Sequence, residues 1–176
     1  MSALQCTIDS SCVIALDHLN LLPQLSILFS RVLIPKAVRD DLFKRRSTKD
    51  RLQSLFETYA FLERCNDYDK GTVDFHLAER AREGKRDRGE VEAVVQATQL
   101  GAMVIVDDPW GRELAARNDL DHHGTLWVLQ RFYDLGLVSS SASRSNFVSL
   151  RDRGIWLPWD KVNEFLVKIN EQPLGP

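Results

Sequence analysis

Three short apolar runs organise the chain: Leu4–Ile8, Val32–Ile34 and Met103–Val106. Short continuous runs of this kind are typical of strands that are buried on both faces of a parallel sheet. Residues with helical spacing follow each run, and Leu120–His122 is a weaker, fourth strand candidate. The alternation of strands and helices predicts an α/β sandwich, with helices on both faces of a central parallel sheet.

Capping residues set the bounds of the expected helices. Ser10 and Asp108 suit N-cap positions, and Gly101 suits a helix end. Pro35 and Pro109 suit first helical positions. We therefore expect helices from Ser10 to about Leu22, Pro35 to about Arg46, Glu90 to Leu100, Pro109 to about Asn118 and Thr125 to Tyr133, and two more within Ser143–Asn170 on either side of 154–158.

Two segments carry weaker signals. Val73, Leu77 and Ala81 have helical spacing within the uncertain stretch 64–88, and residues 84–87 are typical of a turn. Ser139–Ser141 is expected to be a loop. The length predicts a single domain over residues 1–176, in which 140–176 form a C-terminal helical extension packed on the rest.

Composition narrows the class of protein. Hydrophobic residues make up 44% of the 176 residues and charged residues 27%, which is ordinary for a globular domain. No apolar run approaches the length of a membrane span, and the first residues resemble a strand rather than a signal peptide, so we expect a cytoplasmic protein without membrane contact. The three cysteines form no CxxC pair and are expected to be buried thiols. The net charge of −2 argues against coating nucleic acid by bulk charge, but it allows a local basic rim.

Acidic residues follow the expected strands. Asp9 ends the first strand, and Asp107 and Asp108 end the third apolar run. Since ligand sites of parallel sheets lie outside the carboxyl ends of the strands, these acids are expected to converge. Asp41 and Glu90 lie on neighbouring helices from which they can reach the same edge. Clustered carboxylates bind hard divalent cations, so the pattern predicts a site for one or two metal ions and phosphodiester cleavage.

Most of these acids also have a structural interpretation. Asp108 is a good N-cap before a proline, and Asp41 lies four residues from Arg45, which suits a surface ion pair. Glu90 at a helix start interacts favourably with the helix dipole. Asp9 is the hardest to explain in this way, because a buried carboxylate after an apolar strand needs a partner.

Several motifs together resemble the PIN-domain family. They are Thr7–Ser11, Val32–Leu42, Arg88–Ala93 with its Gly-Glu-x-Glu-Ala segment, the pair Asp107-Asp108, and Gly124–Leu126. No single motif is specific, but their order and spacing match one PIN-like branch from about residue 6 to about residue 165. The resemblance implies a PIN-like three-layer α/β/α sandwich and a Mg²⁺- or Mn²⁺-dependent nuclease that cuts RNA.

The resemblance also assigns roles to the acids. It implies that Asp9 is the first metal-binding acid, that Glu90 is the third, and that Asp107 or Asp108 is the fourth. Asp41 stands where the family usually has Glu, and its shorter side chain puts its reach to the metal in question. The Asp-Asp pair replaces the more usual Thr-x-Asp, so both aspartates stay candidates.

The resemblance implies partners as well. Many PIN proteins are VapC-type toxins of toxin–antitoxin pairs, so the expected partners are an RNA substrate, an antitoxin protein and a second copy of the chain. The stretch Leu19–Phe29 is more apolar than one buried helix face requires, which favours an interface there, although these residues also suit a core.

The candidate RNA-binding residues are cations near the acids: Lys44, Arg45, Arg46, Arg86, Arg88 and Arg112. Phosphate contacts by such residues supply non-specific affinity, but a solvated surface is an equally good interpretation of each one alone. The histidines His122-His123 point in opposite directions on a strand and are expected to be structural. The tryptophans are expected to pack in the core, with Trp110 left open as a base-stacking residue.

Three other functions compete with a nuclease. A non-catalytic RNA- or protein-binding module with the same fold is disfavoured because all the acidic positions carry acids. A phosphoacceptor domain would need a lysine at a late strand end, for which there is no good candidate. A haloacid-dehalogenase-like phosphatase would need a second acid two residues after Asp9, where Ser11 stands.

Overall fold

A computed structural model describes residues 4–44, 46–85 and 87–175, with the backbone alone for residues 46–48. The described chain contains a five-stranded sheet in the order β3-β2-β1-β4-β5, in which every neighbouring pair is parallel. The strands are β1 (Gln5–Ile8), β2 (Arg31–Ile34), β3 (Leu62–Arg64), β4 (Met103–Ile105) and β5 (His122–His123). The central parallel sheet predicted from the apolar runs is therefore confirmed.

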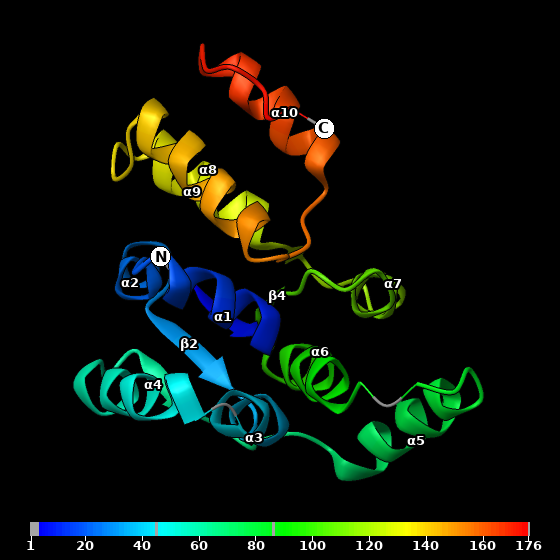
Figure 1. Cartoon of the computed structure of the whole chain (residues 1–176). Helices are drawn as coiled ribbons and strands as arrows, with labels where there is room; N and C mark the ends of the chain where they lie inside the picture. The colour runs from blue at the N-terminus through cyan, green and yellow to red at the C-terminus, as the bar shows by residue number, and fades with distance from the viewer. Residues whose placement is uncertain (1–3, 45, 86, 176) are drawn as a thin grey trace.

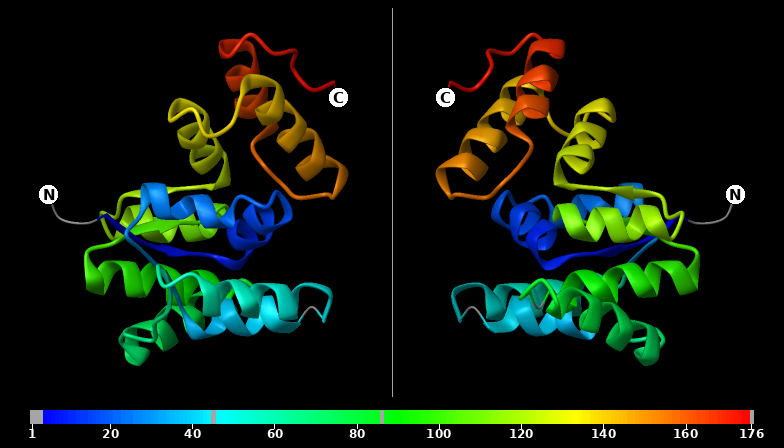
Figure 2. Two further views of the ribbon diagram at one scale, coloured as in Figure 1. Left: turned by 90° about the vertical axis from the view of Figure 1, so that its left-hand side faces the viewer. Right: turned by 90° about the vertical axis from the view of Figure 1, so that its right-hand side faces the viewer.

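The described helices surround this sheet (Figure 1). They are α1 (Ser10–His18), α2 (Leu25–Leu28), α3 (Lys36–Lys44), α4 (Arg46–Thr58), α5 (Lys70–Ala81), α6 (Arg88–Leu100), α7 (Pro109–Arg117), α8 (Thr125–Asp134), α9 (Ser140–Asp152) and α10 (Trp159–Lys168), with a short 3₁₀ helix η1 (Leu22–Gln24). Helices α3 to α6 lie on one face, and α1, α2, α8 and α9 lie on the other (Figures 1 and 2). This three-layer α/β/α arrangement is the predicted fold class.

Strand register brings the acids to one edge. Thr7 of β1 pairs with Leu33 of β2 and with Val104 of β4, so the central strands end nearly level with each other. The backbone N–H of Asp9 then donates to the carbonyl of Ile105 at 2.9 Å. Asp107 follows β4 by two residues. The carboxyl ends of β1 and β4 therefore place their acids side by side.

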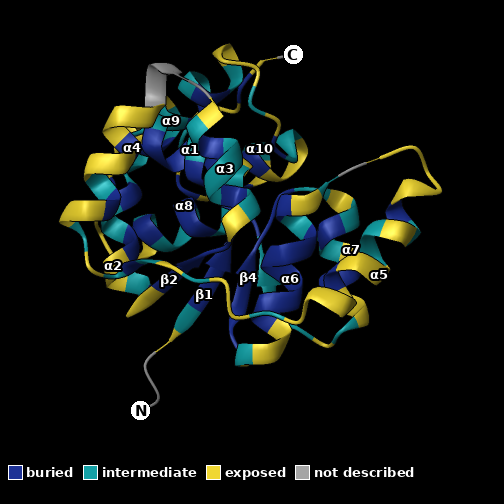
Figure 3. Cartoon of the chain, turned by 90° about the horizontal axis from the view of Figure 1, so that it is seen from below, coloured by how far each residue is buried: buried dark blue, intermediate teal, exposed yellow. Residues whose placement is uncertain are grey.

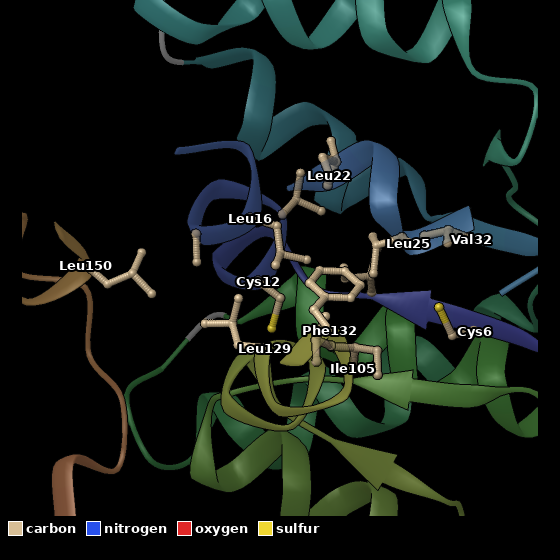
Figure 4. Packing of buried hydrophobic residues seen from close by; sticks show 14 of the residues in the cluster. Cys6, Cys12, Leu16, Leu22, Leu25, Val32, Ile105, Leu129, Phe132 and Leu150 are labelled. Carbon is tan, nitrogen blue, oxygen red and sulfur yellow. The ribbon is translucent and has the colours of Figure 1, made fainter. Parts of the chain in front are cut away.

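A continuous apolar core joins the sheet to the C-terminal helices. Leu16 of α1, Phe132 of α8 and Leu150 of α9 are all fully buried and lie in one cluster (Figure 4). The cluster continues to Leu174 near the end of the chain. Helix α6 is buried along most of its length against β1 and β4, whereas α4 and α5 have exposed faces (Figure 3). Burial of this area is the main driving force for the fold.

The first helical segment differs from the prediction. The helix expected to reach about Leu22 ends at His18, because Asn20 adopts a left-handed conformation with φ of 55°. The chain then turns into η1 and α2. No single described helix is long and apolar enough to cross a bilayer. Helix α1 and the segment Leu22–Leu28 meet that test only together, as a pair bent by 115°. Leu22, Leu25 and Phe29 are buried, so they complete the core, whereas Ile27 is 55% exposed.

Three further differences have local causes. The expected loop Ser139–Ser141 is wrong: the Ser139 hydroxyl accepts a hydrogen bond from the N–H of Ala142 and caps α9, which begins at Ser140. Helix α4 was not predicted because its surface is strongly polar, although its buried Leu52 anchors it to the core. Strand β3 was not predicted either, because it has three residues and only Leu62 is buried.

Candidate active site

A cavity of about 540 Å³ lies at the carboxyl edge of the sheet. Its lining comes from the start of α1, the start of α6, the β4–α7 turn and the connector between α9 and α10. Glu90, Asp107 and Asp108 are among the lining residues, and Ser10 and Ser11 line it beside Asp9. Four of the predicted acids are therefore brought to one place by segments that are far apart in the sequence.

Asp9 is buried at the start of α1. Its carboxylate caps the helix by accepting hydrogen bonds from the Ser11 hydroxyl at 2.6 Å and the Ser11 N–H at 3.3 Å. Burial raises the pKa of Asp9, and the negative charge of Asp107 raises it further, while the bonds from Ser10 and Ser11 lower it. Asp9 thus combines a structural capping role with proximity to a second acid.

Glu90 lies in the first turn of α6, and its carboxyl group has a strongly raised pKa. Burial, followed by the negative charge of Asp9, raises the pKa of Glu90 from its usual 4.5 to about 8. Within the described chain, the hydrogen bond that favours its charged form comes from its own backbone. A Cβ atom on Gly111 would stand 2.8 Å from Cγ2 of Val106 and 3.5 Å from Cβ of Glu90, so the glycine lets α7 lie close to Val106 beside Glu90. Within the described ranges, no lysine, arginine or histidine forms an ion pair with Glu90, and nearby acids raise its pKa further.

Asp107 is held by the start of α8. It accepts hydrogen bonds from the Thr125 hydroxyl at 2.6 Å, the Thr125 N–H at 2.8 Å and the Cys12 thiol at 3.3 Å. A Cβ atom on Gly124 would overlap the Asp107 carboxylate. The Gly-Thr pair of the sequence motif therefore has a physical reason: glycine leaves room for the acid, and threonine binds it.

Asp108 is the N-cap of α7, as predicted. One of its oxygens, Oδ1, accepts the N–H groups of Trp110 at 2.9 Å and Gly111 at 3.0 Å. Its other oxygen accepts no hydrogen bond from the described residues, and the side chain is 33% exposed. Of the two adjacent aspartates, Asp108 has the freer oxygen, whereas Asp107 is fully engaged in holding the fold.

Asp41 reaches the same group of acids. One of its oxygens and one oxygen of Asp9 each lie 3.5 Å from the point where a Cβ atom of Gly89 would stand, so the two carboxylates are neighbours at that glycine. The other oxygen of Asp41 pairs with Lys44 at 2.6 Å. Asp41 is therefore close to Asp9, but a neighbouring lysine already balances its charge.

The donor chemistry of these acids fits a hard divalent cation. All the candidate ligands are carboxylate oxygens, and burial, together with the negative charge of neighbouring acids, raises the pKa of Asp9 and of Glu90. However, no three His, Cys, Asp or Glu side chains in the described ranges lie close enough together to form a metal cage as they stand. The acids are thus close together, but they do not form a complete coordination sphere as they stand.

The predicted RNA-binding cations fall into three groups. Lys44 and Arg88 are engaged in ion pairs, Arg88 with the buried Glu92 at 2.7 Å. Arg45 and Arg86 lie outside the described residues, as does the side chain of Arg46. Arg112 lies beside the site, because its Nη1 atom is 3.3 Å from the point where a Cβ atom of Gly124 would stand.

Arg80 is a site neighbour that sequence reasoning passed over as one cation among many. Its guanidinium is 4% exposed and binds Asp87 at 2.8 Å and Glu83 at 2.7 Å. It also lies 4.6 Å from the ring centre of Trp110 and 4.0 Å from Asp108. The open interpretation of Trp110 is thus resolved in favour of packing under an arginine, on the α7 side of the cavity.

The α9–α10 connector is the second feature that sequence reasoning missed. Trp156 was expected to pack in the core, but it is 58% exposed and lines the cavity together with Arg153. The expectation failed because nothing local in the sequence brings residues 153–156 next to β4. By contrast, His123 stacks on Trp127 with ring centres 4.1 Å apart, in line with its expected structural role.

A parallel α/β sheet with a carboxylate cluster at its carboxyl edge defines a class that includes many metal-dependent hydrolases. A protein-family model described as a PIN domain matches residues 5–171. The chain therefore belongs to the PIN-domain family. PIN domains are in general nucleases and typically use divalent metals, so the fold is of a nuclease type. A search of curated proteins gave no match.

Proposed function

We propose that this protein is a Mg²⁺- or Mn²⁺-dependent ribonuclease. The observation that carries the proposal is the convergence of Glu90, Asp107 and Asp108 on one cavity beside the buried Asp9. Buried carboxylates without cations are unfavourable, and a cluster of them at a strand edge is a candidate functional site. Family membership supports the nuclease class, and the RNA substrate is part of the proposal.

Asp9, Glu90 and Asp108 would hold the cation, with Asp41 close enough to Asp9 to assist. When bound, the cation would supply a water of lowered pKa and neutralise charge on the phosphate. With a pKa of about 8, Glu90 is largely protonated near neutral pH, so it would have to release its proton in order to hold the cation. Asp9 and Asp108 keep their orientation through the helix caps that they form.

Asp107 has a different proposed role. With three hydrogen bonds from Thr125 and Cys12, it positions the β4–α7 turn on which Asp108 stands. The proposal therefore assigns metal binding chiefly to Asp108 and positioning chiefly to Asp107. Arg112, next to the Asp107 end of the cavity, is suited to binding a substrate phosphate near the reacting bond.

A non-catalytic RNA-binding module is the second candidate. It is favoured by one observation, namely that Asp9, Asp107 and Asp108 each accept hydrogen bonds within the chain that stabilise helix starts. In a pure binding module, the only role of these acids is to stabilise the fold. Such a module gives no reason for Glu90, with which no described cation forms an ion pair.

Cleavage of a mixed RNA pool distinguishes the two candidates. The wild-type protein and Glu90→Gln are incubated with the pool in millimolar Mn²⁺ and in chelator, with Glu113→Gln as a control at an exposed glutamate. We expect cleavage in Mn²⁺ by the wild type and the control, and none by Glu90→Gln. RNA binding without cleavage by the wild-type protein in Mn²⁺ or Mg²⁺ would support the binding module instead.

Toxin activity, an antitoxin partner and a cytoplasmic location are finer proposals that rest on the family resemblance. Self-association is proposed through the surface around Ile27, where Leu4 and Leu135 are also largely exposed and line one groove. Exposed apolar side chains that adjoin one another favour protein contact. A monomeric mass in light scattering at high protein concentration would remove the homodimer from this proposal.

A further inference from the structure

The α9–α10 connector forms the wall of the cavity that faces the acids. Residues 153–156 line it together with Glu90 and Asp108, and Figure 2 shows this connector bending from α9 toward α1. The connector joins two helices that belong to the C-terminal part of the chain. A segment far from the acids in sequence therefore contributes about a third of the lining of the same cavity.

The connector presents an exposed indole on a fixed backbone. Trp156 is 58% exposed, although its neighbour Leu157 is fully buried and Ile155 packs against the main core. The N–H of Ile155 donates to the carbonyl of Leu150 at 3.0 Å, and Gly154 allows the turn with a φ of 68°. The exposure of Trp156 is thus imposed by the buried Leu157 on one side of it and the partly buried Ile155 on the other.

A large exposed indole beside a carboxylate site needs a reason, because burial of its apolar area is favourable. We propose that Trp156 and Arg153 form a nucleotide subsite in which an unpaired RNA base stacks on the indole and Arg153 binds an adjacent phosphate. The proposal rests on the proposed function and deepens it, because it names the residues of this chain that bind a nucleotide beside the acids.

Physical chemistry favours a single strand at this place. Stacking on an aromatic ring requires an unstacked base, which a double helix does not offer. The cavity of about 540 Å³ lies in the range of small-ligand sites and suits a nucleotide rather than a duplex. Glu90, Asp107 and Asp108 repel phosphates, so a cation is needed to hold the backbone, and Arg153 is exposed in the lining of the same cavity.

Binding without catalysis tests the subsite. A fluorescently labelled octamer of uridine is titrated with the wild-type chain in chelator and low salt, and its anisotropy is measured. Trp156→Ala is expected to weaken binding by roughly 5- to 100-fold, which is the range for the loss of one stacked base. Trp156→Phe keeps an aromatic face and is expected to stay within about threefold of the wild type.

Two controls make the result specific. Phe75→Ala removes another exposed aromatic side chain, 68% exposed and outside the cavity, and is expected to leave the affinity unchanged. Arg153→Gln is expected to reduce the salt dependence of binding by about one released ion. Melting curves check that each variant is folded, and light scattering detects any change of oligomeric state.

The outcomes separate the subsite from the proposed function. Octamer binding that depends on Trp156 supports the subsite even if the wild-type chain cleaves no RNA in Mn²⁺, a result that would overturn only the nuclease. Equal affinity of Trp156→Ala and wild type would overturn the subsite and leave the nuclease standing. Preferred binding of a duplex, no octamer binding by the wild type, or a change confined to the oligomeric state would overturn the subsite as well.

Discussion

Replacement of Glu90 by Gln should change how the stability of the metal-free protein depends on pH. The pKa of Glu90 is about 8 in the folded chain and returns toward 4.5 on unfolding. The folded state therefore binds the proton more tightly than the unfolded state between these values, and stability falls as the pH rises. Gln has nearly the same shape and stays neutral at every pH, so it removes this loss.

The magnitude follows from the pKa difference. Each pH unit between about 4.5 and about 8 changes the unfolding free energy by at most about 1.4 kcal/mol, giving an upper bound near 5 kcal/mol. Solvent reaches part of the carboxylate, and its titration is tied to that of Asp9, so we expect about 2–4 kcal/mol. Below about pH 4.5, wild type and Glu90→Gln should differ little.

Denaturant unfolding in chelator measures this difference. Wild type, Glu90→Gln and the exposed control Glu113→Gln are unfolded at pH values from 4.5 to 9, and the unfolding free energies are compared at each pH. Glu90→Gln should become progressively more stable than wild type as the pH rises, and Glu113→Gln should follow the wild type throughout. Addition of Mn²⁺ at pH 8 should then stabilise the wild type more than Glu90→Gln.

A constant difference between wild type and Glu90→Gln over the whole pH range would refute this reasoning. So would a variant that is less stable than wild type at pH 8, because Glu90 would then have a stabilising partner in its charged form. Either result would mean that the negative charge of this carboxylate is already balanced. The main support for a cation site would be lost with it.

Two more substitutions test the residues that position the acids. Thr125→Val should lower the unfolding free energy by about 1–3 kcal/mol, because a buried hydrogen bond to Asp107 is lost. In the same denaturant titration, the control Thr98→Val at an exposed position should stay within about 0.5 kcal/mol of wild type. Arg80→Lys should lower the unfolding free energy by about 1–3 kcal/mol, because lysine lacks the planar guanidinium that binds Asp87 and Glu83 together. An unchanged unfolding midpoint would show that these ion pairs contribute nothing to stability.

The sheet and most helices were predictable because their signals are local. Continuous apolar runs identified β1, β2 and β4, and a proline after Asp108 identified the start of α7. Signals failed where an element is short or polar, as in β3 and α4. They failed also where one residue redirects the chain, as Asn20 does by adopting a positive φ. Local propensity cannot reveal a turn that tertiary packing imposes.

The convergence of the acids could be predicted from the sequence, but the cavity wall that carries Trp156 could not. Parallel strands place their following residues at one edge, so Asp9, Asp107 and Asp108 converge by topology alone. The different tasks of Asp107 and Asp108 depend on Thr125 and Cys12, which reach Asp107 from other segments. The wall that carries Trp156 depends on how the C-terminal helices pack, for which the sequence has no local signal.

Cleavage by Asp9→Asn in Mn²⁺ tests the central claim most directly. Asn caps a helix as well as Asp does, so the bonds from Ser11 can be kept while the charge is removed. We predict that Asp9→Asn loses Mn²⁺-dependent RNA cleavage and that its melting temperature in chelator equals or exceeds that of wild type, because repulsion with Asp107 falls. Retained cleavage, or a sharp fall of that melting temperature, would contradict the assignment of Asp9 to a metal site and the nuclease built on it.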